Sequence, residues 1–288
     1  MFDLIKNLIP RRFKIDPLGS YNRLRKILGV ARYRYNSIKK VIDNNPEIPR
    51  LFPEEKMREH YAREPMLQTV EFPVLYVTQI RYYRMYKYFQ LHYPDLFDVK
   101  TQIIDVGDTS GALFQAMGKD GLSVNIHSEI VESIRRNGIR AKIEDAENIS
   151  FNDKSFDCAF CFQTLEHLKN PLKALDELGR ITRKRVFLSV PYVERTSIFN
   201  KDFIVNVKKI SSSIAGKADQ EVRDTDCHIF EFSTKDFKNI LSYTRLEYVD
   251  NFPISYFVPL GETRKNKGAF INFFILKPRG SHIYEDKR

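Results

Sequence analysis

Short apolar runs alternate with amphipathic stretches from Thr101 almost to the end of the chain. Five strand-length runs come first, and they read TQIIDVG, GLSVNI, AKIEDAE, FDCAFCFQ and RVFLSVP. Helical patterns follow the first, second and fourth runs. Because parallel strands need a crossover between them, this alternation predicts a parallel sheet. Two later runs, LEYVDNF and FINFFILKP, complete an expected α/β fold with seven mostly parallel strands and helices on both faces.

The first hundred residues follow a helical rather than a strand pattern. MFDLIKNLIPRRFK spaces its apolar residues as one face of a helix, with lysines and arginines beside the opposite face. Such a helix can lie on an anionic membrane surface or dock on the protein's own body, and both interpretations remain open. Residues 46–53 are expected to form a proline-marked connector. YVTQIRYYRMYKYFQLHY then predicts a long helix ending before Pro94, with its aromatic residues in core contact.

These patterns divide the chain into four expected parts. Residues 1–100 form a basic, mainly helical N-terminal extension, and residues 101–191 form the first part of the core. A polar insertion or lid covers 192–227, and residues 228–288 complete the core and the tail. In the last part Ser233, with Asp236 three residues on, is the expected N-cap of a helix.

Charge and composition narrow the expected partners. The chain has 288 residues, 42% hydrophobic content and a net charge of +10. The first 45 residues hold eleven Lys and Arg against three Asp, so they carry most of the excess. No recognised nucleic-acid motif accompanies them, so nucleic acid is not the expected partner. Without a secretory signal or a long apolar run, we expect a cytoplasmic protein that can reach the inner face of the membrane through its basic segment.

The three cysteines do not indicate a redox or metal site. Cys158 and Cys161 form a C-x-x-C, but they lie within one expected strand, where residues three apart point to opposite faces. Cys227 stands alone. We expect buried core thiols and no metal site.

The stretch IIDVGDTSG, which starts at Ile103, predicts a buried strand that is followed directly by a tight ligand-binding loop. In open α/β sheets the loop after the first strand commonly holds the ligand. A phosphate-binding P-loop needs Lys after its last glycine, and a dinucleotide loop needs G-x-G-x-x-G. Neither pattern is present in this loop.

Four ordered blocks resemble the signature of class I S-adenosylmethionine-dependent methyltransferases of the Rossmann-like type that act on small molecules or glycans. The blocks are IIDVGDTSG, DAENISFNDKSFD, CFQTLEHLKNPLKALDELGRI, and RVFLSVP followed by HIFEFSTKDFKNIL. They stand in the family's order between Thr101 and Lys277. The resemblance implies S-adenosylmethionine as the cofactor.

The resemblance also implies which residues hold this cofactor. Asp105 would hold the ammonium of the methionine part, and Asn125 stands where an acid usually binds the ribose. Asp145 and the amide of Ala146 would read the adenine, and Gln163 to Leu165 would line the sulfonium side. The full set implied to bind the cofactor is Asp105, Gly107, Asp108, Thr109, Gly111, Asn125, Ile126, Asp145, Ala146, Glu147, Gln163, Thr164 and Leu165.

Thr109 and Asn125 depart from the family pattern, since a glycine and an acid usually occupy these positions. Thr109 either narrows the pocket or donates a hydroxyl bond. For catalysis, His167 and His228 are the candidate general bases, because histidine titrates near neutral pH. A structural role at a helix start or in a loop remains open for each. Glu166 could orient the base.

The sequence therefore predicts a methyltransferase that acts on a hydroxyl of a sugar, glycan or glycolipid-type acceptor. Two other functions remain open. The fold could have lost turnover and serve as a binding or scaffolding module, for which Thr109 and Asn125 are the reason. Alternatively, the basic N-terminal segment could serve an RNA methyltransferase, which would lose RNA affinity steeply with added salt.

Overall fold

The computed structural model describes residues 38–54, 74–191, 230, 232–255 and 269–280, and all of them belong to one compact unit. Seven strands form a single sheet in the order β3-β2-β1-β4-β5-β7-β6. The strands are β1 (Ile103–Val106), β2 (Leu122–Asn125), β3 (Arg140–Ile143), β4 (Phe156–Phe162), β5 (Thr182–Pro191), β6 (Leu246–Ser255) and β7 (Ala269–Pro278). β7 lies between β5 and β6 and runs antiparallel to both, whereas the other strand pairs of the sheet are parallel. The expected seven-stranded, mostly parallel α/β fold is confirmed.

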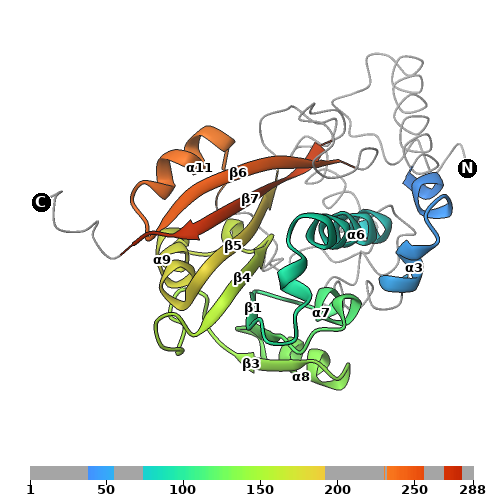
Figure 1. The fold of residues 1–288 in the computed structure, drawn as a ribbon, viewed down its shortest axis with the longest axis horizontal. Helices are drawn as coiled ribbons and strands as arrows, with labels where there is room; N and C mark the ends of the chain where they lie inside the picture. Colours follow the sequence, from blue (N-terminus) through green and yellow to red (C-terminus); the bar gives the residue numbers. More distant parts are fainter. Residues whose placement is uncertain (1–37, 55–73, 192–229, 231, 256–268, 281–288) are drawn as a thin grey trace, which may run out of the picture. The chain divides into compact units, whose positions relative to one another are not determined.

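Helices cover both faces of the sheet (Figure 1). On one side lie α9 (Pro171–Ile181) and α11 (Thr234–Leu241). On the other lie α6 (Val74–His92) and α7 (Ala112–Met117), with α3 (Glu47–Leu51) beyond α6. The helix α8 (Ser128–Arg136) packs Val131 and Ile134 on Ala141 of β3. Two short 3-10 helices, η2 (Pro94–Phe97) and η3 (Leu165–His167), complete the described elements.

The two faces of the sheet have separate cores, as alternation along each strand requires. Phe160 faces the α6 side, where it stacks on Phe89 with ring centroids 5.3 Å apart. Phe274 faces the other side and contacts Phe237 of α11 at 4.3 Å. Because α6 supplies a fully buried phenylalanine to one core, it belongs to the helical layer that covers this face of the sheet.

The cysteine prediction is confirmed for the two residues that the structure describes. Cys158 belongs to the core on the α6 side and Cys161 to the opposite core, and both are buried. Burial raises the pKa of Cys158 to about 11 and raises that of Cys161 further. Neither thiol is therefore a thiolate at neutral pH.

The predictions for the helix boundaries have mixed outcomes. The long helix expected before Pro94 is α6, and Ser233 caps α11 by accepting a hydrogen bond from the Asp236 amide. The expectation of a connector over residues 46–53 is wrong, because α3 lies there. Pro46 stands at its N-cap and Pro49 in its first turn, where a missing N–H costs no helical hydrogen bond.

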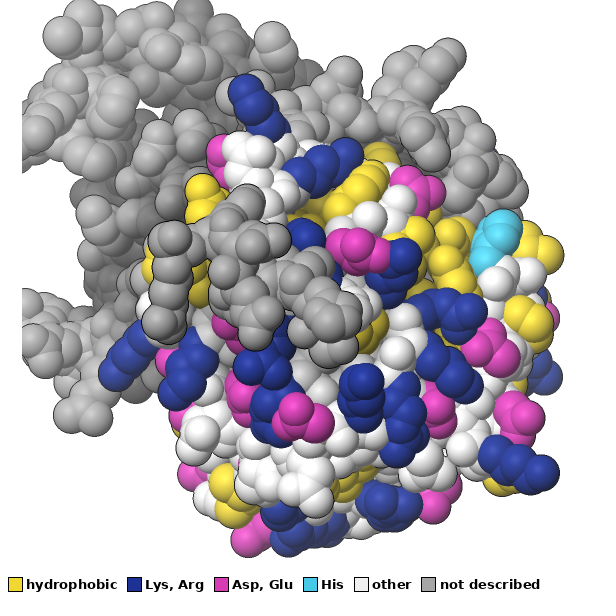
Figure 2. Space-filling model, turned by 60° about the vertical axis from the view of Figure 1, so that its left-hand side comes forward, with side chains coloured by type: hydrophobic (Ala, Val, Ile, Leu, Met, Phe, Trp, Pro, Cys, Tyr) yellow, Lys and Arg dark blue, Asp and Glu magenta, His cyan; other side chains and the backbone are white. Residues whose placement is uncertain are grey.

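The described surface mixes both signs of charge. Figure 2 shows one face on which many Lys and Arg side chains alternate with Asp and Glu. Ion pairs on the surface include Arg180 with Asp153 at 2.9 Å and Lys184 with Asp157 at 3.3 Å. The strongly basic first 37 residues, the insertion at 192–227 and His228 lie outside the described residues. No described helix is long and apolar enough to cross a bilayer.

Candidate cofactor site

The order of the sheet reverses between β1 and β4, and the candidate site lies at the carboxyl ends of these two strands. Asp105 pairs with Phe160 across them, so the loops that follow both strands begin side by side. This switch point is where open α/β sheets bind their ligands. The sequence motifs IIDVGDTSG and QTLEH, far apart in the chain, are brought together there.

The loop after β1 depends on Gly107. Its φ of +84° is in the region that favours glycine, and its N–H donates to the Val124 carbonyl at 2.8 Å. A Cβ at this position would lie 2.6 Å from Cγ2 of Thr164 and closer still to its hydroxyl. Gly107 thus lets the loops after β1 and β4 touch.

Asp108 holds the same loop from within. Its carboxylate accepts hydrogen bonds from the amides of Ser110 and Gly111 at 3.0 Å and from the Ser123 hydroxyl at 2.5 Å. These bonds satisfy amides at the start of α7 and tie the loop to β2. The observed contacts show that Asp108 stabilises the loop, and its expected role in binding the cofactor stays a prediction.

Asn125, at the end of β2, is also a brace. Its side-chain amide donates to the Asp108 carbonyl at 2.9 Å, and its side-chain oxygen accepts from the His127 amide at 3.0 Å. An aspartate could not make the first of these bonds. The departure from the family pattern therefore has a structural use, and each amide group keeps capacity for one more bond.

The expected adenine side is open. Ile126, directly after β2, is 59% exposed. Asp145 is exposed and accepts from the amide of Glu147 at 2.9 Å, while Ala146 is half-buried between them. The Glu147 carboxylate in turn accepts from the Asn170 amide. A flat ring placed against Ile126 would cover apolar surface that is now in water.

The expected sulfonium side is formed by the residues directly after β4. Gln163 adopts a φ of +53°, a conformation rare for a residue with a side chain and frequent at functional sites. The hydroxyl of Thr164 lies 3.2 Å from the Phe162 carbonyl, and Leu165 is fully buried. The three residues are thus fixed by the backbone and the core.

Two buried carboxyl groups mark this region. Asp105 is 4% exposed, and burial, then the charge of Asp108, hold its pKa well above the usual range. Glu166 is fully buried, and desolvation raises its pKa to about 8. Since the described part of the chain encloses Glu166, its carboxyl group has no direct path to an acceptor. Its neighbour His167 is half-buried in η3.

One residue near the site has no counterpart among the residues expected from the sequence. Arg81 of α6 is only 6% exposed, and its charge offsets a part of the burial effect that raises the pKa of Asp105 and of Glu166. Beside it, Tyr82 is hydrogen-bonded to Ser110 of the ligand loop. The sequence pattern does not predict the burial of Arg81, because an arginine in an amphipathic helix is expected on the solvent-exposed face.

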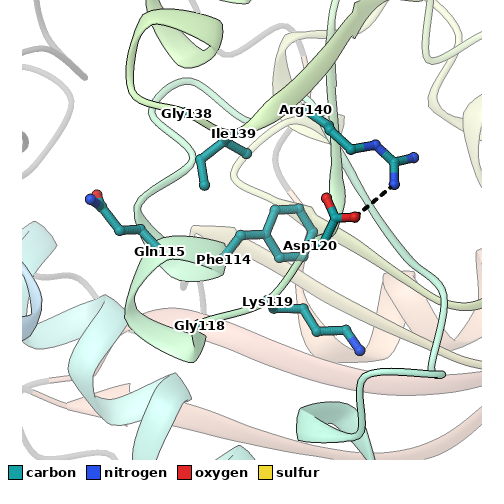
Figure 3. A pocket seen from close by; sticks show the side chains of 8 residues that line it. All are labelled: Phe114, Gln115, Gly118, Lys119, Asp120, Gly138, Ile139 and Arg140. Carbon is teal, nitrogen blue, oxygen red and sulfur yellow. Dashed lines mark hydrogen bonds and ion pairs between the residues drawn. The ribbon is translucent and has the colours of Figure 1, made fainter.

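A separate pocket lies at the opposite edge of the sheet (Figure 3). Its volume is about 250 Å³. It is lined by Phe114, Gln115, Gly118, Lys119, Asp120, Gly138, Ile139 and Arg140. Residues 118–120 precede β2 and residues 138–140 lead into β3, so this pocket is at the amino ends of the strands. It is not part of the candidate site.

The features at the carboxyl edge fit S-adenosylmethionine. Asp105 accepts no hydrogen bond from any described residue, so its carboxylate is available to the ammonium of a ligand. Gly107 lets the loop after β1 pack directly on Thr164, and Ile126 offers an apolar surface. Among the described residues no cluster of three or more His, Cys, Asp or Glu could hold a metal ion.

Comparison with known proteins agrees with this geometry. Residues 104–190 match the family model described as a methyltransferase domain. A SAM-dependent methyltransferase from Thermotoga maritima shares the fold, with a TM-score of 0.50, 20% identity, and 77% of this chain and 99% of that chain covered. Magnesium protoporphyrin IX methyltransferase from Synechocystis PCC 6803, solved with bound SAH, has a TM-score of 0.50 and 14% identity, over 78% of this chain and 94% of that chain. No curated protein matches the sequence.

The domain match and the fold confirm the enzyme class expected from the sequence. The chain has the fold of a class I methyltransferase, its enzyme class is S-adenosylmethionine-dependent methyltransferase, and S-adenosylmethionine is the cofactor.

Proposed function

We propose that the protein transfers the methyl group of S-adenosylmethionine to a hydroxyl group of a sugar, glycan or glycolipid-type acceptor. The observation that supports methyl transfer is the paired arrangement at the switch point. There Asp105, which accepts no hydrogen bond from the described residues, and the Gly107 loop lie beside the residues that follow β4. When bound, the cofactor supplies a methyl group already activated by the positive sulfur.

The work left to the protein is to orient the acceptor and to exclude water. A hydroxyl becomes a good nucleophile only as its proton leaves, so a base nearby accelerates the reaction. His167 is the proposed base, because it follows the sulfonium-side residues and its amide is held by the Thr164 carbonyl at 3.0 Å. Glu166 is proposed to position η3 from the core, and His228 is a second proposed base.

The acceptor class is supported by charge. The first 45 residues carry an excess of eight positive charges, whereas the rest of the chain is nearly balanced. A basic segment of this kind suits an anionic acceptor at a membrane surface. We therefore propose a cytoplasmic protein with peripheral contact to the inner face of the membrane.

Calorimetric titration of the full chain with S-adenosylmethionine and S-adenosylhomocysteine tests the cofactor. We expect binding of both, and no heat with either would contradict the proposed function. A panel of hydroxyl, amine and RNA acceptors, analysed for the methylated product by mass spectrometry, then tests the reaction. Binding without turnover on any acceptor would instead favour a scaffolding role.

The membrane part needs its own experiment. Deletion of residues 1–45 should reduce partitioning onto vesicles that contain anionic lipid, and it should leave partitioning onto neutral vesicles unchanged. Equal partitioning of the truncated and full chains would remove the support for an acceptor at the membrane.

A further inference from the structure

Phe230 is an aromatic side chain that the fold leaves in contact with water. Of the phenylalanines and tyrosines whose exposure the structure describes, only two are exposed, Phe230 at 37% and Tyr243 at 76%. The others pack in or against the cores on the two faces of the sheet. One exposed apolar ring is common on protein surfaces and is not a site by itself, so the place of the ring in the fold decides its meaning.

The direction of the strands places Phe230 at the carboxyl edge of the sheet, where the candidate site lies. β7 runs antiparallel to both β5 and β6, so β6 has the direction of β5 and begins at the amino edge. The helix α11 leads into β6, and it therefore begins at the carboxyl edge, close behind Phe230 in the chain. Tyr243 follows the end of α11 and lies at the opposite edge.

A hydrogen bond joins Phe230 to the segment after β4. The Phe230 amide donates to the carbonyl of Glu166 in η3 at 3.2 Å. The next residue of η3 is His167, the proposed base, which is half-buried. Gln163, just before η3, is also half-buried, and its amide donates to the Ser189 carbonyl at 2.9 Å. Phe230 thus lies beside the residues that the proposed function assigns to the reaction.

The ring of Phe230 is held in place by other aromatic rings. It stacks on Phe232 with ring centroids 6.0 Å apart and an interplanar angle of 17°. Phe232 is 4% exposed and contacts Phe237 of α11 edge to face at 5.8 Å. Because the stack covers one side of the Phe230 ring, its other side is left for a ligand. A ring that is already ordered loses little conformational entropy when it binds one.

We propose that Phe230 binds the acceptor by stacking on the apolar face of a closed pyranose ring, and that it selects cyclic sugars over open-chain polyols. The assignment rests on the proposed function and deepens it, because it names the feature of the sugar that is recognised. The C–H groups of a pyranose form a flat apolar face, which an aromatic ring can cover. The hydroxyl groups at the rim of the sugar stay available to polar side chains beside the aromatic ring.

The test compares cyclic and open-chain acceptors of the same hydroxyl pattern. Methyl glycosides of glucose, mannose and galactose are paired with sorbitol, mannitol and galactitol, and the full chain is assayed with S-adenosylmethionine by mass spectrometry. The unaltered protein should prefer the glycoside of a pair. Phe230→Leu keeps an apolar side chain without the flat face, so it should lower kcat/KM for the glycoside roughly threefold to tenfold, mainly through KM. The value for the polyol should change by less than about twofold.

Three further variants keep the result interpretable. Phe230→Tyr keeps the flat ring and should keep the preference for the glycoside. Tyr243→Leu makes the same kind of change at the exposed ring on the opposite edge, and it should alter neither rate. Calorimetry with S-adenosylhomocysteine checks that Phe230→Leu retains the cofactor site, and Phe230→Met, which also lacks a flat face, replaces it if it does not fold.

The outcomes separate the assignment from the proposed function. Equal losses for glycoside and polyol in the leucine or methionine variant, or no loss for either, would overturn the role of Phe230 alone. The same holds if the unaltered protein methylates both members of each pair equally well. Methylation of an amine or RNA acceptor but of no glycoside would overturn the sugar acceptor, and with it the proposed function.

Discussion

At the scale of single residues, the site depends on contacts too short to admit a side chain. Gly107 has a positive φ and lies against Thr164, whereas Gly138 has a φ of +78° with nothing within 4 Å of the position of a Cβ. Both glycines have a positive φ, but only Gly107 has a neighbouring side chain at its Cβ position. A comparison of alanine variants at the two positions therefore separates the effect of backbone strain on stability from the effect of a steric clash.

Gly107→Ala should destabilise the fold and weaken cofactor binding. We expect a loss of about 2–4 kcal/mol in the free energy of unfolding, because backbone strain and the clash with Thr164 add. Gly138→Ala, with strain alone, should lose about 1 kcal/mol and retain cofactor affinity. Urea unfolding and calorimetry measure both. Equal losses in the two variants would show that Thr164 does not crowd this position.

Glu166 should make stability depend on pH. The pKa of its folded state is about 8 against 4.5 for an ordinary glutamate, so between these values the folded state holds a proton that the unfolded state has lost. Stability from this group is greatest below pH 4.5 and falls as pH rises towards 8, by up to about 1.4 kcal/mol per pH unit.

Glu166→Gln removes this ionisation and keeps the shape of the protonated group. As the pH rises from 4.5 to 7, the free energy of unfolding of the variant should increase by about 3 kcal/mol relative to that of the unaltered protein. The reason is that only the unaltered protein must protonate this carboxyl group on folding. Urea unfolding at several pH values measures the difference, and Asp105, present in both proteins, cancels. Parallel curves over this range would mean that the carboxyl is not held in an apolar environment.

At the scale of elements, the sequence predicted most strands and helices because alternation and capping are local. Ser233 is an example, since its hydroxyl accepts from the Asp236 amide at 3.2 Å, as a capping residue should. The helix α3 was not predicted, because prolines usually mark connectors. The structure shows that these prolines occupy the N-cap and the first turn of the helix. Arg81 was missed for a different reason: its burial depends on how α6 packs on the rest of the fold, which the pattern of the helix alone does not show.

Ser233→Ala should cost α11 its N-cap. The expected loss is about 1 kcal/mol in the free energy of unfolding, since an alanine leaves a helical amide without its acceptor. Ser242→Ala is the matched control at the other end, because the Ser242 hydroxyl donates to the Asn239 carbonyl and caps no amide. If the two variants lost the same amount, the Ser233 cap would not be the source of the effect.

At the scale of the whole molecule, the sheet and its two cores follow from the pattern of the chain, and the site follows from the order of the strands. Alternation along one strand is enough to predict that Cys158 and Cys161 face opposite cores, and they do. The neighbourhood of β1 and β4 cannot be read from local pattern, since three crossovers, by way of β2 and β3, separate the two strands in the chain. The resemblance to the methyltransferase family predicted that the loops after β1 and β4 lie together, and the contact of Gly107 with Thr164 confirms it.

The last prediction concerns the place of α6 in the molecule. Phe89 is fully buried against Phe160, Phe187 and Phe273, whereas Leu91, two residues on, is 75% exposed. Phe89→Ala should therefore cost about 3–5 kcal/mol in the free energy of unfolding, and Leu91→Ala less than about 0.5 kcal/mol. Urea unfolding followed by circular dichroism measures both. If Phe89→Ala were as mild as its control, α6 would be an appendage and not part of the core of the fold.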